Sequence, residues 1–133
     1  MARVQLALNV ADLDEAVEYY SKLFDTAPAK RRPGYANFAI ADPPLKLVLF
    51  DGGEGAPSLN HLGVEVDSTG EVVTATRRLA GEGLGTEVED ATTCCYATQD
   101  KVWVTGAGGH RWEIYTVLSD AGVDEPASCC SPA

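Results

Sequence analysis

The sequence predicts an α+β fold of two tandem β-α-β-β-β modules whose mixed sheets enclose a cleft. The 133 residues are 45% apolar, which suits one compact domain or two small modules that share a core. The chain also repeats itself. Shifted by 56 residues, RVQLALNVADLDEAVEYYSKLF meets NHLGVEVDSTGEVVTATRRLAG, with Leu6 over Leu62 and Val17 over Val73. Each copy has the pattern of an alternating strand followed by a helix.

Each predicted helix has a start signal and is followed by extended stretches. Asp12-x-x-Glu15 and Ser68-x-x-Glu71 both have the pattern of a capping box. Turns such as DPP and GAGG separate the extended stretches, which lie roughly at residues 29–32, 35–41 and 45–50, and again at 86–89, 96–105 and 111–118. We therefore expect module one at about 1–52, module two at about 58–118, and a flexible Cys-containing tail at 119–133.

Charge and cysteine usage limit the function classes. The net charge of −10 would repel nucleic acid and anionic membranes. The sequence has no long apolar run and its start lacks the features of a signal peptide, so we expect a cytoplasmic protein that does not enter membranes. Thiols stay reduced there, which favours a metal, metalloid or catalytic role for the four cysteines over disulfides.

Two cysteines, Cys94 and Cys95, are adjacent in ATTCCYATQD. A disulfide between neighbours would be strained, whereas two thiols can hold one soft atom. The pair lies in a region that is 11 residues longer than its counterpart, because Phe24 to Leu45 spans 21 residues and Ala80 to Trp112 spans 32. A longer hairpin is the simpler interpretation of this insertion. A buried pair of small apolar side chains is the alternative for the thiols, although strand neighbours point to opposite faces. The nearby Lys101 is expected to be solvated.

Gln5, His61 and Glu113 are candidate metal ligands. Gln5 is the repeat partner of His61, and Lys46 is the repeat partner of Glu113, so the three candidates occupy related strand positions. If both modules present equivalent faces, all three side chains point into the cleft. The alternative is a hydrogen-bonded core histidine and a glutamate that faces water.

The repeat, together with NHLGVEV and WEIY, resembles the vicinal oxygen chelate superfamily of glyoxalases and extradiol dioxygenases. Within it, TTCCYA combined with QDKVWVTG is similar to the organoarsenical carbon–arsenic lyases, which are close to proteins described as cadmium-induced. The resemblance implies a non-haem Fe(II) enzyme that uses dioxygen, with the metal-binding cleft of that fold. It implies Gln5, His61 and Glu113 as iron ligands and catalytic residues, and Cys94 and Cys95 as the substrate-binding thiols.

The expected reaction is cleavage of the carbon–arsenic bond in methyl- or aryl-arsenous acids, giving arsenite for arsenic detoxification. Two thiolates can replace both hydroxyls of such an acid and leave its carbon substituent in place. The alternatives are a non-catalytic thiol protein that binds cadmium or arsenic, and an antibiotic-binding superfamily member. The sequence leaves open the preferred organic group, the metal bound in a crystal, and the role of Cys129 and Cys130. Superfamily members often pair, so a homodimer is a further expectation.

Overall fold

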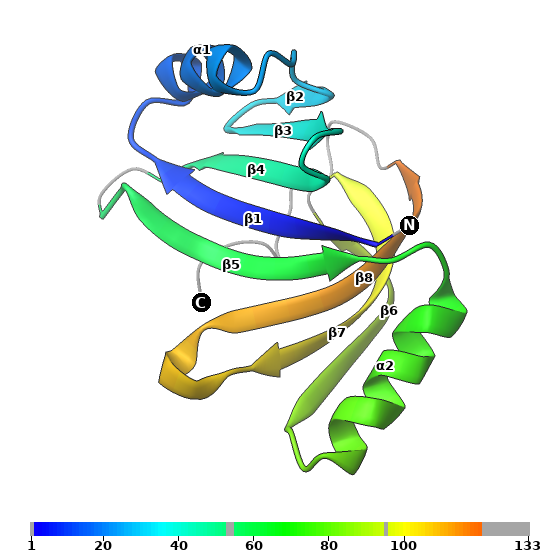
Figure 1. Ribbon diagram of the computed structural model, residues 1–133. Coiled ribbons are helices and arrows are strands. Elements are labelled where there is room, and N and C mark those ends of the chain that lie inside the picture. Colours follow the sequence, from blue (N-terminus) through cyan, green and yellow to red (C-terminus); the bar gives the residue numbers. More distant parts are fainter. Residues whose placement is uncertain (1, 53–54, 95, 121–133) are drawn as a thin grey trace. The chain divides into compact units, whose positions relative to one another are not determined.

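The computed structural model describes residues 2–52, 55–94 and 96–120, which divide into two compact units. The N-terminal unit covers Arg3–Asn60, and the C-terminal unit continues from His61. The N-terminal unit contains β1 (Arg3–Val10), α1 (Leu13–Leu23), β2 (Lys30–Arg32), β3 (Tyr35–Ile40) and β4 (Leu45–Asp51). β5 (Ser58–Glu65) crosses the boundary and is followed by α2 (Thr69–Gly81), β6 (Thr86–Cys94), β7 (Ala97–Thr105), the short 3-10 helix η1 (Ala107–Gly109) and β8 (Arg111–Asp120) (Figure 1).

The two units have the same mixed strand arrangement. In the N-terminal unit the order is β2-β3-β4-β1, with β1 and β4 parallel and the other neighbours antiparallel. In the C-terminal unit the order is β5-β8-β7-β6, with β5 and β8 parallel and the other neighbours antiparallel. The predicted α+β class with two β-α-β-β-β modules is confirmed. The predicted module limits stay predictions, and residues 121–133 of the tail lie outside the described residues.

Both helices begin at the predicted caps. The Asp12 carboxylate accepts a hydrogen bond from the Glu15 backbone N–H at 3.0 Å. The Ser68 hydroxyl accepts from the Glu71 backbone N–H at 3.3 Å, and the Glu71 carboxylate accepts from the Asp67 N–H at 2.8 Å. These bonds satisfy N–H groups that the first helical turn cannot pair, which explains why local sequence fixed both helix starts. Neither helix among the described residues has the length and apolar composition needed to cross a membrane.

The core of the N-terminal unit lies between α1 and the sheet. Val17 is the buried residue of α1 and packs in one cluster with alternate residues of β3 and β4, namely Ala36, Phe38, Ile40, Leu47 and Leu49. Strand alternation puts these apolar side chains on one face, and the helix covers that face.

In the C-terminal unit, alternate residues of β7 point to opposite faces of the sheet. α2 packs against β6, β7 and β8. Asp100 marks the helix side, because its carboxylate accepts a hydrogen bond at 2.6 Å from the Thr69 hydroxyl at the start of α2. By alternation Val102 shares that side, whereas Gln99, Lys101 and Trp103 point to the opposite one.

The extra residues of the second module lengthen its hairpin. β6 and β7 have nine residues each, against three for β2 and six for β3. The predicted strand at 86–89 was too short: a register shift between Glu89 and Thr92, with Ala91 at φ 49°, lets β6 continue to Cys94. A bulge absorbs one extra residue without ending the ladder, and short-range propensity does not reveal it. The Asp100 carboxylate accepts from the Ala91 N–H at 2.6 Å and supports the bulge.

Two details of the repeat alignment were wrong. Val73, the predicted counterpart of buried Val17, is 43% exposed, and its neighbour Val72 is buried instead. In the first unit Gln5 pairs directly with Lys46. In the second unit Glu113 pairs with Gly63, which is two residues after His61. A shift of two residues keeps side chains on the same strand face, so the predicted facing of His61 and Glu113 is unaffected.

We predict that Ser68→Ala lowers the free energy of unfolding by about 1 kcal/mol, because the α2 cap loses its side-chain acceptor. Urea titration followed by circular dichroism measures the difference. The matched control is Thr74→Ala, an exposed position inside the same helix, which should change stability by less than about 0.5 kcal/mol. Equal losses in both variants would show that the cap contributes nothing specific.

Candidate functional site

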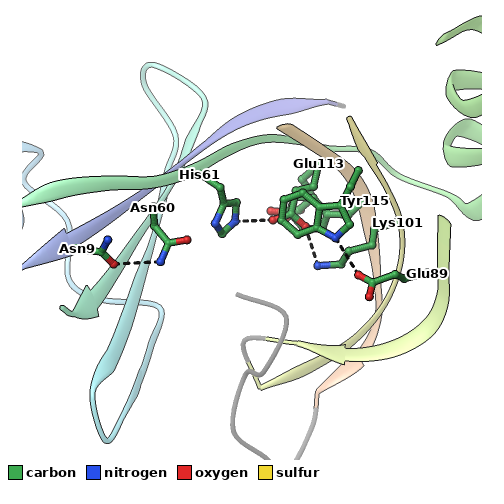
Figure 2. Close-up of polar contacts among 9 residues, drawn as sticks. Asn9, Asn60, His61, Glu89, Lys101, Glu113 and Tyr115 are labelled. Carbon is green, nitrogen blue, oxygen red and sulfur yellow. Dashed lines mark hydrogen bonds and ion pairs between the residues drawn. The ribbon is translucent and has the colours of Figure 1, made fainter. Parts of the chain in front are cut away.

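His61 and Glu113 form a buried pair on the polar face of the C-terminal unit. His61 comes from β5 and is 3% exposed, and Glu113 comes from β8 and is 2% exposed. The His61 Nε2 and Glu113 Oε2 atoms lie 2.6 Å apart (Figure 2). The sequence analysis predicted both residues, with Gln5, as ligands of one ion. The structure places the His61 and Glu113 side chains side by side, and the ligand role stays a prediction.

Lys101 is a third member of this site and was wrongly expected to be solvated. It is 0% exposed, and its Nζ atom lies 2.7 Å from Glu113 Oε1 (Figure 2). Glu113 thus holds a histidine on one oxygen and an ammonium on the other. A lone buried lysine would be very costly, so its burial requires a partner such as this carboxylate.

Glu113 remains ionised despite its burial. Burial by itself would raise the pKa of this carboxyl group, but the hydrogen bond from His61 and the charge of Lys101 outweigh that effect. The pKa of Glu113 is lowered from 4.5 to about 2. The carboxylate is therefore available as a ligand across the physiological pH range, without the loss of a proton.

Strand register explains how three distant residues meet. β5 and β8 are parallel neighbours, and β7 and β8 are antiparallel neighbours. Lys101 pairs with Tyr115, Trp103 pairs with Glu113, and Gly63 of β5 pairs with Glu113 from the other side. Residues two apart on a strand share a face, which puts the charged side chains of these strands together. The sequence signal for Lys101 was available: Gln99, Lys101 and Trp103 alternate with Asp100 and Val102, so a strand here cannot leave all of them in solvent.

Two aromatic rings surround the charged groups. The Trp103 ring lies 5.3 Å from Lys101 Nζ, and the Tyr115 ring lies 5.7 Å from the same atom. The Tyr115 hydroxyl donates a hydrogen bond to Glu65 Oε1 at 3.2 Å. The negative faces of aromatic rings favour a nearby cation, so both rings support the buried ammonium. The sequence analysis did not identify either residue as part of the site.

Gln5 lies in the N-terminal unit, on β1, and is 4% exposed. Alternation puts it on the same face of β1 as Ala7 and Asn9. Asn9 accepts a hydrogen bond from the Asn60 side chain at 3.0 Å (Figure 2). It also donates one to the Ser58 hydroxyl at 2.9 Å. This face of the N-terminal unit therefore also carries buried amides, which suits a polar role for Gln5.

The adjacent cysteines are only partly described. Cys94 is the last residue of β6 and pairs with Ala97, the first residue of β7. Cys95 lies outside the described residues, as do Cys129 and Cys130. Tyr96 completes the connection between the strands, with φ at 61° and a buried ring. Only the backbone of Cys94 is thus placed, at the end of β6, and the role of the thiol pair stays a prediction.

The donor set fits a divalent ion. An imidazole nitrogen and a carboxylate oxygen are donors that ferrous iron takes in facial sites. Lys101 lies at Oε1 of Glu113, and Oε2 of the same carboxylate faces His61. Within residues 2–52, 55–94 and 96–120, no group of three or more His, Cys, Asp or Glu side chains is placed to hold a metal ion. The Gln5 amide of the N-terminal unit is chemically suitable as a neutral oxygen donor, and its role as a ligand stays a prediction.

We predict that the stability contribution of Glu113 depends on pH. A pKa lowered to about 2 in the folded protein stabilises it fully above pH 4.5, and this effect is lost as the pH falls toward 2. The lowered pKa of Glu113 corresponds to a contribution of about 3 kcal/mol to the free energy of unfolding. Because glutamine resembles a protonated glutamate, the metal-free Glu113→Gln variant should be much less stable than the native chain at pH 6 and should approach it near pH 3.

Urea unfolding at several pH values measures this difference. Glu87→Gln, which alters an exposed carboxylate on β6, is the matched control and should show a small difference at every pH. A difference for Glu113→Gln that stays constant from pH 6 to pH 3 would contradict the prediction.

The chain is similar to proteins of known family. The family model of the Glyoxalase/Bleomycin resistance protein/Dioxygenase superfamily matches residues 3–114. The cadmium-induced protein CadI of Mycobacterium tuberculosis is 64% identical over 121 residues, which cover 91% of this chain and 80% of that protein. The trivalent organoarsenical cleaving enzyme of Thermomonospora curvata is 59% identical over 136 residues, covering 99% of this chain and 90% of the enzyme.

A solved structure supports the fold. The Mn(II)-bound glyoxalase from Novosphingobium aromaticivorans has a TM-score of 0.65 at 14% identity, over 96% of this chain and 44% of that one. The resemblance found from NHLGVEV, WEIY and the repeat is therefore confirmed. The chain belongs to the glyoxalase/bleomycin resistance protein/dioxygenase superfamily.

Proposed function

We propose that this chain cleaves the carbon–arsenic bond of trivalent organoarsenicals, methyl- or aryl-arsenous acids, in an Fe(II)- and dioxygen-dependent reaction that releases arsenite. The observation that carries the proposal is the buried His61–Glu113 pair, in a chain that is 59% identical to a trivalent organoarsenical cleaving enzyme over 99% of its length. The identity level makes a shared donor set and a shared thiol pair the simplest expectation.

His61 Nε2, Glu113 Oε2 and the Gln5 side-chain oxygen are the proposed iron ligands. When bound, ferrous iron supplies the one-electron chemistry that activates dioxygen. His61 Nε2 donates its hydrogen to Glu113 in this structure, so it must give up that proton to ligate. Glutamine is a neutral and weak donor, so the proposal includes loosely held iron.

Lys101 contributes to this site through Glu113. Its ammonium lies at Oε1 and helps to keep the carboxylate ionised, and Oε2 faces His61. A buried lysine fixed by an ion pair and by two aromatic rings cannot easily leave this position. We propose that Lys101 fixes the orientation of the ligand carboxylate.

Cys94 and Cys95 are the proposed substrate thiols. Each thiol forms a sulfur–arsenic bond and displaces one hydroxyl of the arsenous acid as water, so the carbon–arsenic bond stays intact during capture. For methylarsenous acid, one dioxygen balances the whole reaction: one oxygen atom enters formaldehyde, the other enters arsenite, and no further reductant is needed. Holding the arsenic by two bonds raises its effective concentration at the reacting site.

A second candidate function is a thiol protein that binds cadmium or arsenic without catalysis. It is favoured by the 64% identity to a protein whose name says that cadmium induces it. The buried His61–Glu113–Lys101 group would then have only a structural role. Oxygen consumption with methylarsenous acid separates the two candidates, because a binding protein consumes none.

Reduced thiols are a requirement of both candidates, so we propose a cytoplasmic location. Pairing of two chains as a homodimer stays a prediction of the family resemblance.

We predict that the Cys94→Ser, Cys95→Ser double variant loses turnover by about 100-fold or more, because the second attachment of arsenic is lost. Its iron content should equal that of the native chain. The measurement is arsenite, formaldehyde and oxygen consumption with Fe(II) and methylarsenous acid, which should change in equal amounts. The matched control is the Cys129→Ser, Cys130→Ser double variant, which should keep most activity because these residues lie outside the repeated modules.

His61→Ala should lose both iron and turnover, since it removes a proposed ligand. Near-normal turnover in the Cys94→Ser, Cys95→Ser variant would exclude the thiol pair as the substrate site. Arsenic binding without oxygen consumption by the iron-loaded native chain would instead favour the second candidate.

A further inference from the structure

We propose that Trp103 is a positioning residue for His61, and that Glu89 and Arg111 hold its indole ring in place. This inference rests on the proposed function in one respect, the role of His61 as a metal ligand. Together, these three residues fix the orientation of the His61 imidazole ring.

The Trp103 ring contacts the imidazole directly. The two ring centroids lie 5.3 Å apart, and the ring planes meet at 71°. This is an edge-to-face arrangement, in which the positive edge of one ring meets the negative face of the other. Trp103 is buried, so the contact is shielded from water. A histidine ring has a broad, roughly two-fold torsion about its last bond, so neighbouring groups must choose its plane.

Two charged side chains fix the indole itself. Its Nε1–H donates a hydrogen bond to Glu89 Oε1 at 2.8 Å, from the neighbouring strand β6. The Arg111 guanidinium carbon lies 4.0 Å from the ring centroid, which is a close cation–π stack. Arg111 and Trp103 also line a hollow of about 210 Å³ with Glu87, Thr86 and Thr105. The indole is therefore held by a carboxylate at its nitrogen and a cation at its ring, with open space nearby into which it would otherwise turn.

The consequence for His61 concerns which nitrogen faces Glu113. In this structure Nε2 faces Glu113 Oε2, which is the arrangement that two ligands of one ion need. If the indole turned away, the imidazole could rotate and remove Nε2 from that position. Partners that orient ligating histidines typically contribute 10–100-fold to metal affinity. Trp103 acts through His61, so it is a positioning residue and not a catalytic one.

The primary test observes His61 in the metal-free protein. The chain has two histidines, so imidazole signals in nuclear magnetic resonance spectra can be assigned with a His110→Gln variant. In Trp103→Leu, the His61 ring signals should lose the ring-current shift of the indole and report a second ring orientation. In Trp103→Phe, which keeps an aromatic edge, His61 should stay close to its native signals. Trp112→Phe alters the other tryptophan, on the opposite face of β8, and is the matched control.

The second test uses cobalt(II) as a probe metal. Trp103→Leu should bind cobalt(II) about tenfold more weakly, with an altered visible spectrum, whereas Trp103→Phe and Trp112→Phe should bind as the native chain does. Glu89→Leu should produce an intermediate loss, and Glu89→Gln, which keeps an acceptor oxygen, should restore native binding. Circular dichroism confirms that each variant is folded.

The outcomes separate this inference from the proposed function. Native His61 signals in folded Trp103→Leu would overturn the inference, whatever the metal affinity. Equal effects of Trp103→Leu and Trp112→Phe would also overturn it, because they would indicate a general loss of packing. If the native chain binds no cobalt(II) but His61 reorients in Trp103→Leu, the proposed metal site fails while the positioning role stands.

Discussion

The C-terminal unit depends on one buried carboxylate, Glu113, that is shared between a histidine and a lysine. An ionised carboxylate with 2% exposure would cost several kcal/mol if it were unpaired. The His61 bond at 2.6 Å and the Lys101 bond at 2.7 Å offset that cost and lower the pKa of Glu113 to about 2. Each of the three groups needs the others, so the strands β5, β7 and β8 are constrained to present them at one place.

The two faces of the sheet in the C-terminal unit carry different kinds of side chain. The face that holds His61, Lys101 and Glu113 is mixed, because the buried rings of Trp103 and Tyr115 lie beside these charged groups. On the other face, α2 packs on β6, β7 and β8 and buries Val72 and Leu79. On this helix-covered face, Asp100 bonds both the start of α2 and the bulged backbone of β6. Both faces therefore contribute to the stability of the unit, one through apolar packing under α2 and the other through the paired charges and the rings beside them.

The sequence predicted what is encoded locally and missed what depends on pairing between strands. Capping boxes at Asp12 and Ser68 and the alternation of strands are short-range signals, so both helices and the succession of elements along each module were correct. The burial of Lys101, the bulge at Ala91 and the exposed side of Val73 depend on which neighbours each strand and helix meets. His61 and Glu113 were found because the repeat put them on related strands. Trp103 and Glu89 were missed because nothing in a single sequence shows that an indole nitrogen faces a particular carboxylate.

The charges of the site suggest why a lysine belongs beside a ligand carboxylate. With neutral histidine, ionised Glu113 and protonated Lys101, the group is neutral overall, and a glutamine ligand would leave it so. Under the proposed function, a divalent ion in such a set keeps its full charge uncompensated in a low-dielectric setting. A second carboxylate ligand would cancel part of that charge and weaken the attraction for anionic groups. Under the proposed function, Lys101 then has two roles: it orients Glu113, and it balances the charge of the ligand carboxylate, in a chain whose net charge is −10.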